Sequence, residues 1–415
     1  MSTAVGSNPL VAAWSRTRRP ALIGALGLAL LAGLAVTGVL DRNRTAASPP
    51  LLAEVVRAPA AEQAAWLAAG TVPQVLELGE STMFTDALRD LHALGQPDGV
   101  TVAGWAGPWR YVWPRDSGLA AAALARTGHL SDAVRILDFL QRMQPESGVF
   151  QARYRPDGSG VPDDRGEQLD GLGWALWATS RVAAGVPPAD RAGFVRRYQS
   201  MIDRSTATTL ALIDNRRSLP PVSADYWETR EWRLTLATAA MLHAGLQAAA
   251  ELYASVGDVE GQRRAGDGAG RLASAIERRF GPDGYPRHLG GRADSVDLRV
   301  DFLLPPFSSH VDPGVVRAWR HAGEVMARPA GGLAPGGSWR DDGLSWTTST
   351  SIHALTAAAL GDREQAVRWL RWLDQHRTST GSLPEKVTAA GAPAAVAPLA
   401  WAAAAVILTA YELDH

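Results

Sequence analysis

The residues from Tyr226 to Trp232, with the sequence Tyr-Trp-Glu-Thr-Arg-Glu-Trp, bring two carboxylates, an arginine and two tryptophans into an otherwise apolar, alanine-rich part of the chain. A carboxyl group held between tryptophan rings is partly removed from water, which raises its pKa and lets it keep a proton near neutral pH. Glu228 is therefore a candidate general acid. The alternative is that Glu228 is an ordinary acidic residue in the first turn of a helix over Thr229–Val256, where the helix dipole favours negative charge.

A general acid that cleaves a bond between sugars works with a second carboxylate on the other side of that bond. Glu385 is the candidate for this second group, in the stretch Gly-Ser-Leu-Pro-Glu-Lys that ends at Lys386. The two carboxylates lie far apart in the sequence, so this hypothesis requires a fold that brings their loops together.

An arginine–aspartate pair, Arg115 and Asp116, opens an alanine- and leucine-rich segment and follows three tryptophans, among them Trp109 and Trp113. Such a pair can donate and accept hydrogen bonds at fixed geometry, which suits neighbouring hydroxyl groups of a sugar. The alternative is a buried structural ion pair.

Two further loops concentrate polar and aromatic residues. The loop Asp163–Asp170 leads into a predicted helix; it fits both a solvated turn and a pocket rim, and Asp170 can also cap the helix. The loop Trp339–Trp346 is aromatic and acidic, and it adds Arg340 and Asp342 as candidate substrate-binding residues. Uncommon residues that cluster in successive loops before helices are not typical of a solvated surface, and they predict a pocket.

The composition excludes several classes of function. The 415-residue chain has a net charge of −1, so it lacks the basic footprint of a nucleic-acid-binding protein. It has no cysteine, which excludes disulfides and thiolate chemistry. The nine histidines show no ligand spacing, and no phosphate-binding motif is present, so we expect neither a metal site nor a cofactor.

An uncharged apolar run from Pro20 to Leu40 is long enough to cross a bilayer, and three arginines precede it. This pattern predicts a cytoplasmic tail over residues 1–19, a transmembrane anchor over 20–40 and a tether over 41–75. A cleaved signal peptide, with Ala46–Ser48 as the cleavage region, and a buried helix are the alternatives. The anchor predicts a single-pass protein of the cell membrane with its domain outside the cytoplasm; cleavage predicts a secreted protein.

Residues 76–415 show helical periodicity almost without strands, which predicts an all-α domain. The predicted helices are Ser81–Leu94, Asp116–Arg126, Ser131–Met143, Leu169–Ala184, Pro188–Ile202, Thr229–Val256, Val259–Phe280, Pro313–Ala327, Thr347–Leu360, Arg363–Gln375 and Pro398–Leu413, with a further one near Arg204–Ile213. An irregular repeat relates Leu124–Gln141 to Leu355–Asp374, each a helix, a glycine turn and a second helix. Repeated helix pairs with long loops on one side predict a closed (α/α)6 barrel of helical hairpins, preceded by the transmembrane helix.

The order of these motifs resembles the family 15 glycoside hydrolases, the glucoamylase-type enzymes. The segment Tyr111–Leu119 is similar to the family's aromatic-Trp-x-Arg-Asp-Ser segment, and Trp227–Arg230 is similar to its Trp-Glu segment in the bacterial form. The segment Ser382–Glu385 resembles the one that carries the catalytic base, and Asp341–Leu344 and Ala359–Ala366 resemble a bacterial-type loop and helix pair.

The resemblance covers about residues 80–412 and has two departures. Thr229 stands where many fungal relatives have a second acidic residue, and Ser345, Trp346 and Thr347 stand in the loop where the bacterial branch usually has a Gly and a Glu. Both changes fall where the leaving sugar is expected.

The resemblance implies exo hydrolysis of an α-glucosidic bond in an oligo- or disaccharide, with inversion and without a cofactor. Glu228 would be the general acid and Glu385 the general base that activates water, with their carboxyl groups roughly 6.5–9.5 Å apart. Arg115 and Asp116 would hold the terminal sugar. Apolar walls are expected from Trp109, Trp113 and Trp227, and rim contacts from Asp170 and Arg230.

Two other classes of protein remain open. One is a non-catalytic carbohydrate-binding or sensing membrane protein on a glycosidase-like barrel. The other is a different (α/α)6 enzyme, phosphorolytic or eliminating, although the sequence shows no basic cluster for a phosphate. The linkage that is cleaved and the oligomeric state are not defined by the sequence.

Overall fold

The computed structural model of the chain describes residues 50–53, 60–95, 100–292 and 295–414. These residues belong to one compact unit, Ser48–His415. The predicted transmembrane segment 20–40 lies outside the described residues. Among the residues that are described, no helix is both long and apolar enough to cross a membrane.

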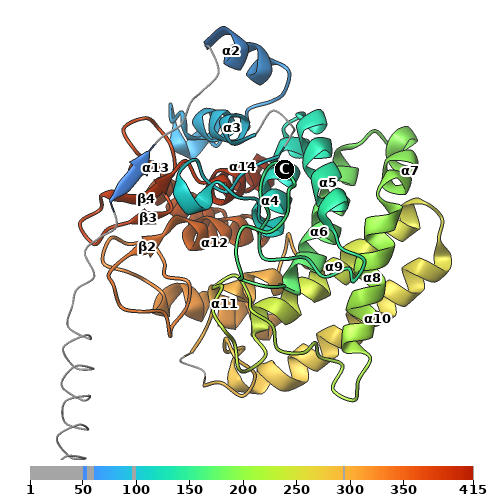
Figure 1. The fold of residues 1–415 in the computed structure, drawn as a ribbon. Helices are drawn as coiled ribbons and strands as arrows, with labels where there is room; N and C mark the ends of the chain where they lie inside the picture. Colours follow the sequence, from blue (N-terminus) through green and yellow to red (C-terminus); the bar gives the residue numbers. More distant parts are fainter. Residues whose placement is uncertain (1–49, 54–59, 96–99, 293–294, 415) are drawn as a thin grey trace, which may run out of the picture. The chain divides into compact units, whose positions relative to one another are not determined.

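Six inner elements of this unit contact one another in a closed ring (Figure 1). In ring order they are α4 (Pro114–Arg126), α6 (Asp170–Gly185), α9 (Leu236–Ser255), the 3₁₀ helix η4 (Leu298–Leu303), α12 (Thr347–Ala359) and α14 (Ala400–Asp414). Each inner element packs on an outer helix. Helix α3 (Met83–Leu94) packs on α14, α5 (Leu130–Met143) on α4 and α6, and α8 (Gln199–Ile213) on α6 and α9. Helix α10 (Val259–Phe280) packs on α9, α11 (Pro313–Val325) on η4, and α13 (Arg363–Gln375) on α12. The expected helical (α/α)6 arrangement is therefore present.

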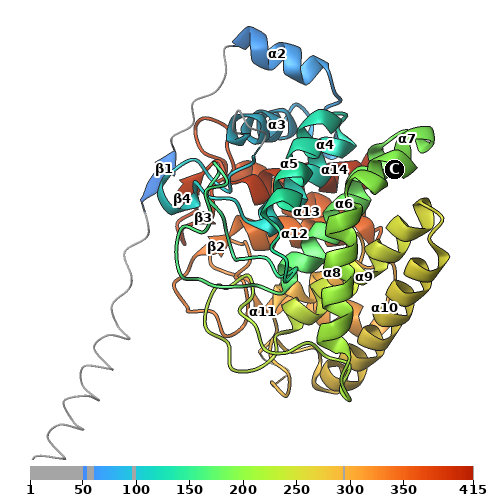
Figure 2. The same cartoon turned by 45° about the vertical axis from the view of Figure 1, so that its right-hand side comes forward.

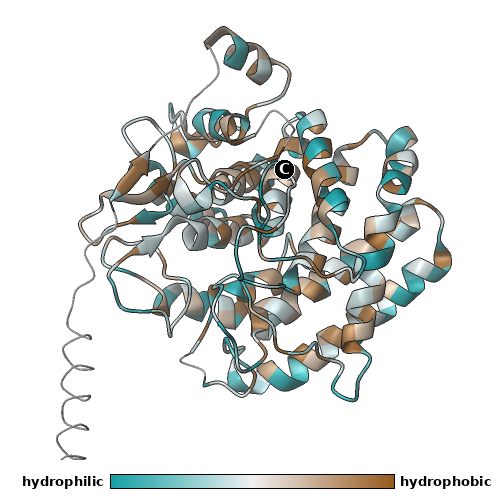
Figure 3. Cartoon of the chain, in the orientation of Figure 1, coloured by the Kyte–Doolittle hydropathy of each residue, from teal (hydrophilic) through white to brown (hydrophobic). Residues whose placement is uncertain are grey.

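The sequence of each helix explains its layer. The inner helices α4, α6, α9, α12 and α14 are rich in alanine, so they can be buried on every side; in α4 every residue from Pro114 to Ala125 is buried. The outer helices are amphipathic, and Figure 3 shows hydrophilic and hydrophobic segments in turn along α10. Helices α6 and α9 approach each other closely: a Cβ atom added to Gly173 would lie 2.1 Å from the carbonyl oxygen of Met241.

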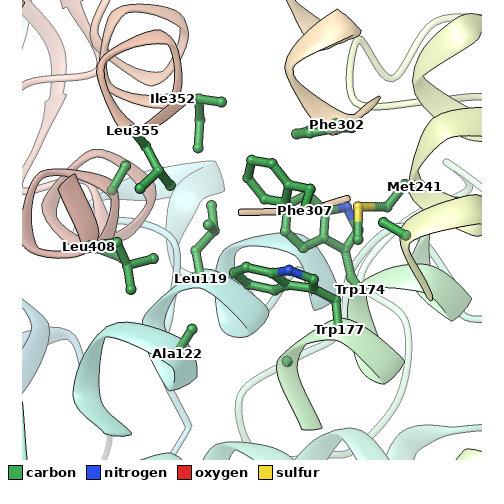
Figure 4. Close-up of a cluster of buried hydrophobic side chains, with 14 of the residues drawn as sticks. Leu119, Ala122, Trp174, Trp177, Met241, Phe302, Phe307, Ile352, Leu355 and Leu408 are labelled. Carbon is green, nitrogen blue, oxygen red and sulfur yellow. The ribbon is translucent and has the colours of Figure 1, made fainter. Parts of the chain in front are cut away.

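A cluster of large apolar side chains fills the centre of the ring (Figure 4). Trp174 makes edge-on contacts with Phe302, with ring centroids 5.3 Å apart, and with Phe307 at 5.9 Å. Leu119 and Ile352 join the cluster from α4 and α12. Because residues from all six inner elements meet here, the core holds the ring together and fixes the loops at its ends.

Three predicted helices differ from the observed ones. The helix expected over Thr229–Val256 begins only at Leu236, because the side chain of Thr235 caps it by accepting from the backbone of Thr238. The helix expected over Pro188–Ile202 is divided at Tyr198 into α7 (Pro188–Arg197) and α8, and α8 includes the further helix expected near Arg204–Ile213.

The sixth inner element was not predicted. Residues Leu298–Leu303 form the short helix η4, which is entirely buried. Its buried charged residues, Arg299 and Asp301, break the apolar pattern that marks the other inner helices, so the periodicity does not reveal it.

The domain is not purely helical. A small sheet has the strand order β1-β4-β3-β2, from β1 (Leu51–Ala53), β2 (Ser345–Trp346), β3 (Lys386–Val387) and β4 (Pro393–Ala397). Strand β1 runs parallel to β4, and the other neighbours are antiparallel. Figure 2 shows β2–β4 on the same side of the helices as the long loops after α5 and α8.

Part of the tether expected over residues 41–75 is folded onto the domain. Besides β1, residues Ala60–Ala68 form helix α2, which contacts α3. The ring of Trp66 stacks on His129 with centroids 3.6 Å apart, and its Nε1–H donates to Asp132 at 3.0 Å. The domain therefore includes these residues, and residues 41–49 and 54–59 of the predicted tether lie outside the described part of the chain.

Candidate active site

A cavity of about 410 Å³ is formed by the loops at one end of the ring. Its volume is in the range of small-molecule sites. Both candidate carboxylates and most of the other predicted site residues line it: Trp109, Trp113, Arg115, Asp116, Trp227, Glu228 and Glu385. The remaining lining residues are Ala103, Pro108, Arg153, Arg165, Tyr226, Pro335, Trp339, Trp346, Thr348, Leu399 and Trp401.

Glu228 projects from a tight turn and not from a helix. Its backbone has a φ of 55°, and its N–H donates to the carbonyl oxygen of Asp225 at 2.8 Å. The carboxylate of Asp225 is fixed in turn by Arg287 at 2.9 Å. The left-handed conformation is uncommon for a residue with a side chain and is maintained by this network. The alternative reading of Glu228 as a residue in a helix's first turn is therefore wrong.

Both carboxylate oxygens of Glu228 have partners. The Nε1–H of Trp113 donates to Oε1, and Nη1 of Arg165 donates to Oε2. Nη2 of Arg115 lies 3.7 Å from Oε1. The sequence predicted a carboxyl group desolvated between tryptophan rings, but the structure places two guanidinium groups beside it. Neighbouring cations favour the charged form of a carboxylate, so these surroundings are not the apolar ones that the sequence predicted.

Glu385 lies between the sheet and the start of α12. Its N–H donates to the carbonyl oxygen of Val396 at 2.7 Å, and its own carbonyl oxygen accepts from Thr347 at 3.1 Å. Burial raises the pKa of this carboxyl group, while Lys386 and the side chain of Trp109 act in the opposite direction. Nζ of Lys386 lies 3.4 Å from Oε2, so the lysine does turn toward Glu385.

Arg115 and Asp116 lie in the first turn of α4, behind Pro114 at its first position. Both are buried, with Nη2 of Arg115 3.5 Å from Oδ2 of Asp116. Nε and Nη1 of Arg115 have no hydrogen-bond partner among the described residues, although they are buried. Buried donors without a partner are costly. Burial also raises the pKa of Asp116, against the effect of Arg115.

Tryptophan rings make up most of the apolar wall. The rings of Trp227 and Trp339 meet edge-on with centroids 4.6 Å apart, and Trp339 meets Trp346 in the same way at 5.2 Å. The indole of Trp401 lies 4.8 Å from the guanidinium carbon of Arg115. Sequence reasoning did not single out Trp339, Trp346 and Trp401 as site residues. Trp339 and Trp346 bracket a loop that it did mark, whereas Trp401 lies in an alanine-rich helix that looks like core.

Four predicted site residues do not line the cavity. Asp170 is buried in the first turn of α6, where burial raises its pKa to about 6, and its side chain does not cap the helix. Arg230 is exposed and stacks on Trp232 at 4.0 Å. Arg340 is exposed beside Trp339, and Asp342 accepts a hydrogen bond from the backbone of Leu344 at 3.1 Å, which shapes its own loop.

Two arginines in the cavity were not predicted. Arg153 is buried, donates to the carbonyl oxygen of Pro108 at 2.7 Å and pairs with Asp163. Asp163 also lies 3.2 Å from Nε of Arg165, which pairs with Glu228. The marked loop Asp163–Asp170 contains Arg165, but no local pattern shows that it reaches Glu228.

The three arginines of the cavity correct the expectation that no basic cluster exists. Each of them is already paired with a carboxylate: Arg115 with Asp116, Arg153 with Asp163, and Arg165 with both Asp163 and Glu228. The cluster is therefore compensated and does not form an open phosphate site. Within the described residues, no group of three or more acidic or histidine side chains is arranged to hold a metal ion.

A second cavity of about 610 Å³ lies between α9, α10 and the segment that leads into α11. Of its side chains, Glu251 and Glu277 are exposed, and Tyr285 is its one aromatic residue. It lacks the paired buried carboxylates and the tryptophan wall of the first cavity, which is the better candidate for an active site.

No family model matches the chain. A curated relative, the isomaltose glucohydrolase of Kribbella flavida, is 24% identical over 308 residues, which are 67% of this chain and 74% of that protein. A wild-type glycosidase structure is similar with a TM-score of 0.68 and 21% identity, over 86% of this chain and 99% of the other. A bacterial glucoamylase complexed with acarbose gives a TM-score of 0.67 and 19% identity, over 85% of this chain and 58% of the other. The relative and the structural neighbours are glycoside hydrolases, as the resemblance implied, and the chain has the fold of the glucoamylase-like members.

Proposed function

We propose that this protein is an inverting, exo-acting glycoside hydrolase for α-glucosidic linkages. One observation carries the proposal: Glu228 and Glu385, which are far apart in the sequence, line one cavity together with the buried pair Arg115–Asp116 and a tryptophan wall. Paired carboxylates, a polar anchor for hydroxyl groups and aromatic platforms are the parts that a glycosidase needs.

In this mechanism Arg115 and Asp116 bind hydroxyl groups of the terminal glucose unit. Both residues are buried in the cavity wall, and we expect them to bind hydroxyl groups at the end of a sugar chain. The indoles of Trp109, Trp113 and Trp227 supply apolar faces against which the sugar rings pack. This arrangement supports exo action.

Glu228 then gives a proton to the glycosidic oxygen as the bond to the leaving group breaks. Glu385, ionised with the help of Lys386, takes a proton from a water molecule that attacks the anomeric carbon from the opposite face. The burial of Glu385 supports this role, since a desolvated carboxylate is a stronger base. The distance of roughly 6.5–9.5 Å expected between the two carboxyl groups stays a prediction.

Isomaltose is the substrate that we propose to test first, because the curated relative is an isomaltose glucohydrolase. Maltose and trehalose are the comparison substrates. We also propose that the domain acts outside the cytoplasm, which follows from the apolar run 20–40 and from the arginines before it.

The experiment that tests the function incubates the purified chain with these three disaccharides and follows glucose release, beside the Glu228→Gln and Glu385→Gln variants. Release of glucose from one linkage, lost in both variants, supports the proposal. Binding of the sugars without release by the unmodified chain would contradict it and would favour the non-catalytic sugar-binding alternative.

A further inference from the structure

Arg165 contacts one of the two carboxylate oxygens of the proposed general acid. Its Nη1 donates to Oε2 of Glu228, while Trp113 donates to Oε1. A proton donor must carry its proton on an oxygen that faces the leaving group. A guanidinium group has no lone pair to accept that proton and repels it electrostatically. Each carboxylate oxygen has two lone pairs, so the two donors leave room for a proton, but the guanidinium in contact with Oε2 disfavours the protonated form. Release of Arg165 therefore favours the form of Glu228 that can protonate a glycosidic oxygen.

The structure distinguishes the donor that can move from those that cannot. Trp113 precedes α4 and is only 7% exposed, and Arg115, the other cation near Glu228, is only 8% exposed. The side chain of Arg165 is 35% exposed and comes from the long loop between α5 and α6. Arg165 is therefore the partner that an incoming molecule can displace.

A second contact would still hold Arg165 after its contact with Glu228 is broken. Its Nε lies 3.2 Å from Oδ2 of Asp163, and the ion pair with buried Arg153 fixes Asp163. Arg153 is anchored by the carbonyl oxygen of Pro108 at 2.7 Å and by its position over the Trp113 ring at 5.0 Å. Rotation of the outer part of the Arg165 side chain can break the contact with Glu228 without breaking the one with Asp163.

We propose that Arg165 is a positioning residue that holds the Glu228 carboxylate through an ion pair and is displaced from it by the leaving-group sugar. Its displacement allows Glu228 to take up one proton from solvent, which the glutamate then transfers to the glycosidic oxygen as the bond breaks. The carboxylate that remains pairs with Arg165 again after the leaving sugar departs. The inference rests on the proposed hydrolase function.

The charged groups around Glu228 come from four parts of the chain. Helix α4 contributes Arg115 and Asp116, and the loop after α5 contributes Arg165. On its own loop, Asp225 is paired with Arg287 and not with Glu228. The remaining charges in the cavity are Arg153, which is paired with Asp163, and Glu385, which is paired with Lys386. Of these, Arg115 and Arg165 are the ion-pair partners of Glu228, and Arg115 is the less mobile one.

The test measures the titration of the Glu228 carboxyl group by ¹³C NMR on the full chain with labelled glutamate, assigned with the Glu228→Gln variant. In Arg165→Gln the midpoint should rise by about 1 pH unit or more, because an opposite charge in contact favours the ionised form. Arg155→Gln is the matched control: Arg155 lies in the same loop, is exposed and donates to the carbonyl oxygen of Val161 at 3.0 Å. In Arg165→Lys the titration midpoint should return most of the way to that of the unmodified chain, because a cation again stands at this position.

Kinetic measurements test the displacement of Arg165 from Glu228. The upper limb of the kcat/KM pH profile for a disaccharide should move to higher pH in Arg165→Gln and not in Arg155→Gln. Hydrolysis of α-glucosyl fluoride, whose leaving group needs little protonation, should be insensitive to the same change. An unmoved carboxyl titration in a folded Arg165→Gln variant would overturn the proposal. A moved titration in a chain that hydrolyses no substrate would instead overturn the hydrolase function.

Discussion

The indole of Trp113 donates a hydrogen bond to the carboxylate of Glu228, although 115 residues separate them in the sequence. Trp113 ends the loop before α4, and Glu228 lies on the tight turn that precedes α9. The contact joins the loop that carries the sugar-binding pair to the loop that carries the proposed acid. One direct bond therefore links the two loops.

Loss of this bond should impair catalysis more than binding. In Trp113→Phe the ring is kept and the donor is removed, so Oε1 of Glu228 loses its neutral partner. We expect kcat to fall by about ten-fold or more, which corresponds to roughly 1.4 kcal/mol, with a smaller change in KM. Trp401→Phe is the control, because its Nε1 has no partner among the described residues. Equal losses in both variants would mean that the bond does not position the acid.

Removal of either carboxylate should abolish turnover. General acid and general base each contribute about 10² to 10⁴ in rate, so Glu228→Gln and Glu385→Gln should lower kcat by at least about 10². Isothermal titration calorimetry with glucose should show that both variants still bind, because Arg115 and Asp116 are intact. Activity that survives in Glu385→Gln would place the base elsewhere.

The pH profile should reflect the burial of Glu385. Burial raises the pKa of Glu385. As the pH falls, this base should therefore become protonated, and activity should be lost, at a higher pH than for an exposed glutamate. Lys386→Met removes the cation 3.4 Å from Oε2, so the acidic limb of kcat/KM should move up by about 1 pH unit. Arg340→Met, which removes an exposed cation outside the cavity, should leave the limb where it is. A downward movement in Lys386→Met would contradict this account of Glu385.

The turn that carries Glu228 depends on a buried ion cluster. Arg287 pairs with Asp225 at 2.9 Å, with Glu231 at 2.6 Å and with Asp297 at 2.5 Å, and its guanidinium lies 3.6 Å from the centroid of Trp227. Arg287→Met would leave three buried carboxylates without this partner, and we expect a loss of at least about 3–5 kcal/mol of unfolding free energy in urea. Arg279→Met on the exposed face of α10 should change it little. Similar stabilities would show that the cluster is not needed for folding.

The α6–α9 crossing should not tolerate a methyl group. Gly173→Ala would place its Cβ atom 2.1 Å from the carbonyl oxygen of Met241, so the inner helices would have to move apart. We expect a loss of about 1–3 kcal/mol in unfolding free energy. Gly193→Ala in α7 meets nothing within 4 Å and should stabilise the protein by up to about 1 kcal/mol. If Gly173→Ala were more stable than Gly193→Ala, the α6–α9 crossing would be less tightly packed than the structure indicates.

Local sequence patterns were sufficient to predict those site residues whose type is unusual in their part of the chain. Glu228, Glu385 and the Arg115–Asp116 pair stand in polar, aromatic loops between alanine-rich helices, so their positions could be predicted. Arg165 could not be assigned, because an arginine in a polar loop looks like solvated surface until a distant glutamate is placed beside it. Strand β1 was missed for a similar reason: its partner β4 lies near the other end of the chain.

The stereochemistry of the released sugar tests the central claim most directly. The chain would be incubated with the α-linked disaccharide that it hydrolyses, and the first glucose released would be followed by ¹H NMR before the anomers interconvert. Two carboxylates that act as acid and base on opposite faces predict β-glucose, and its release should disappear in Glu228→Gln and Glu385→Gln. Initial release of α-glucose would mean retention of configuration, and the roles of Glu228 as general acid and Glu385 as general base would be wrong.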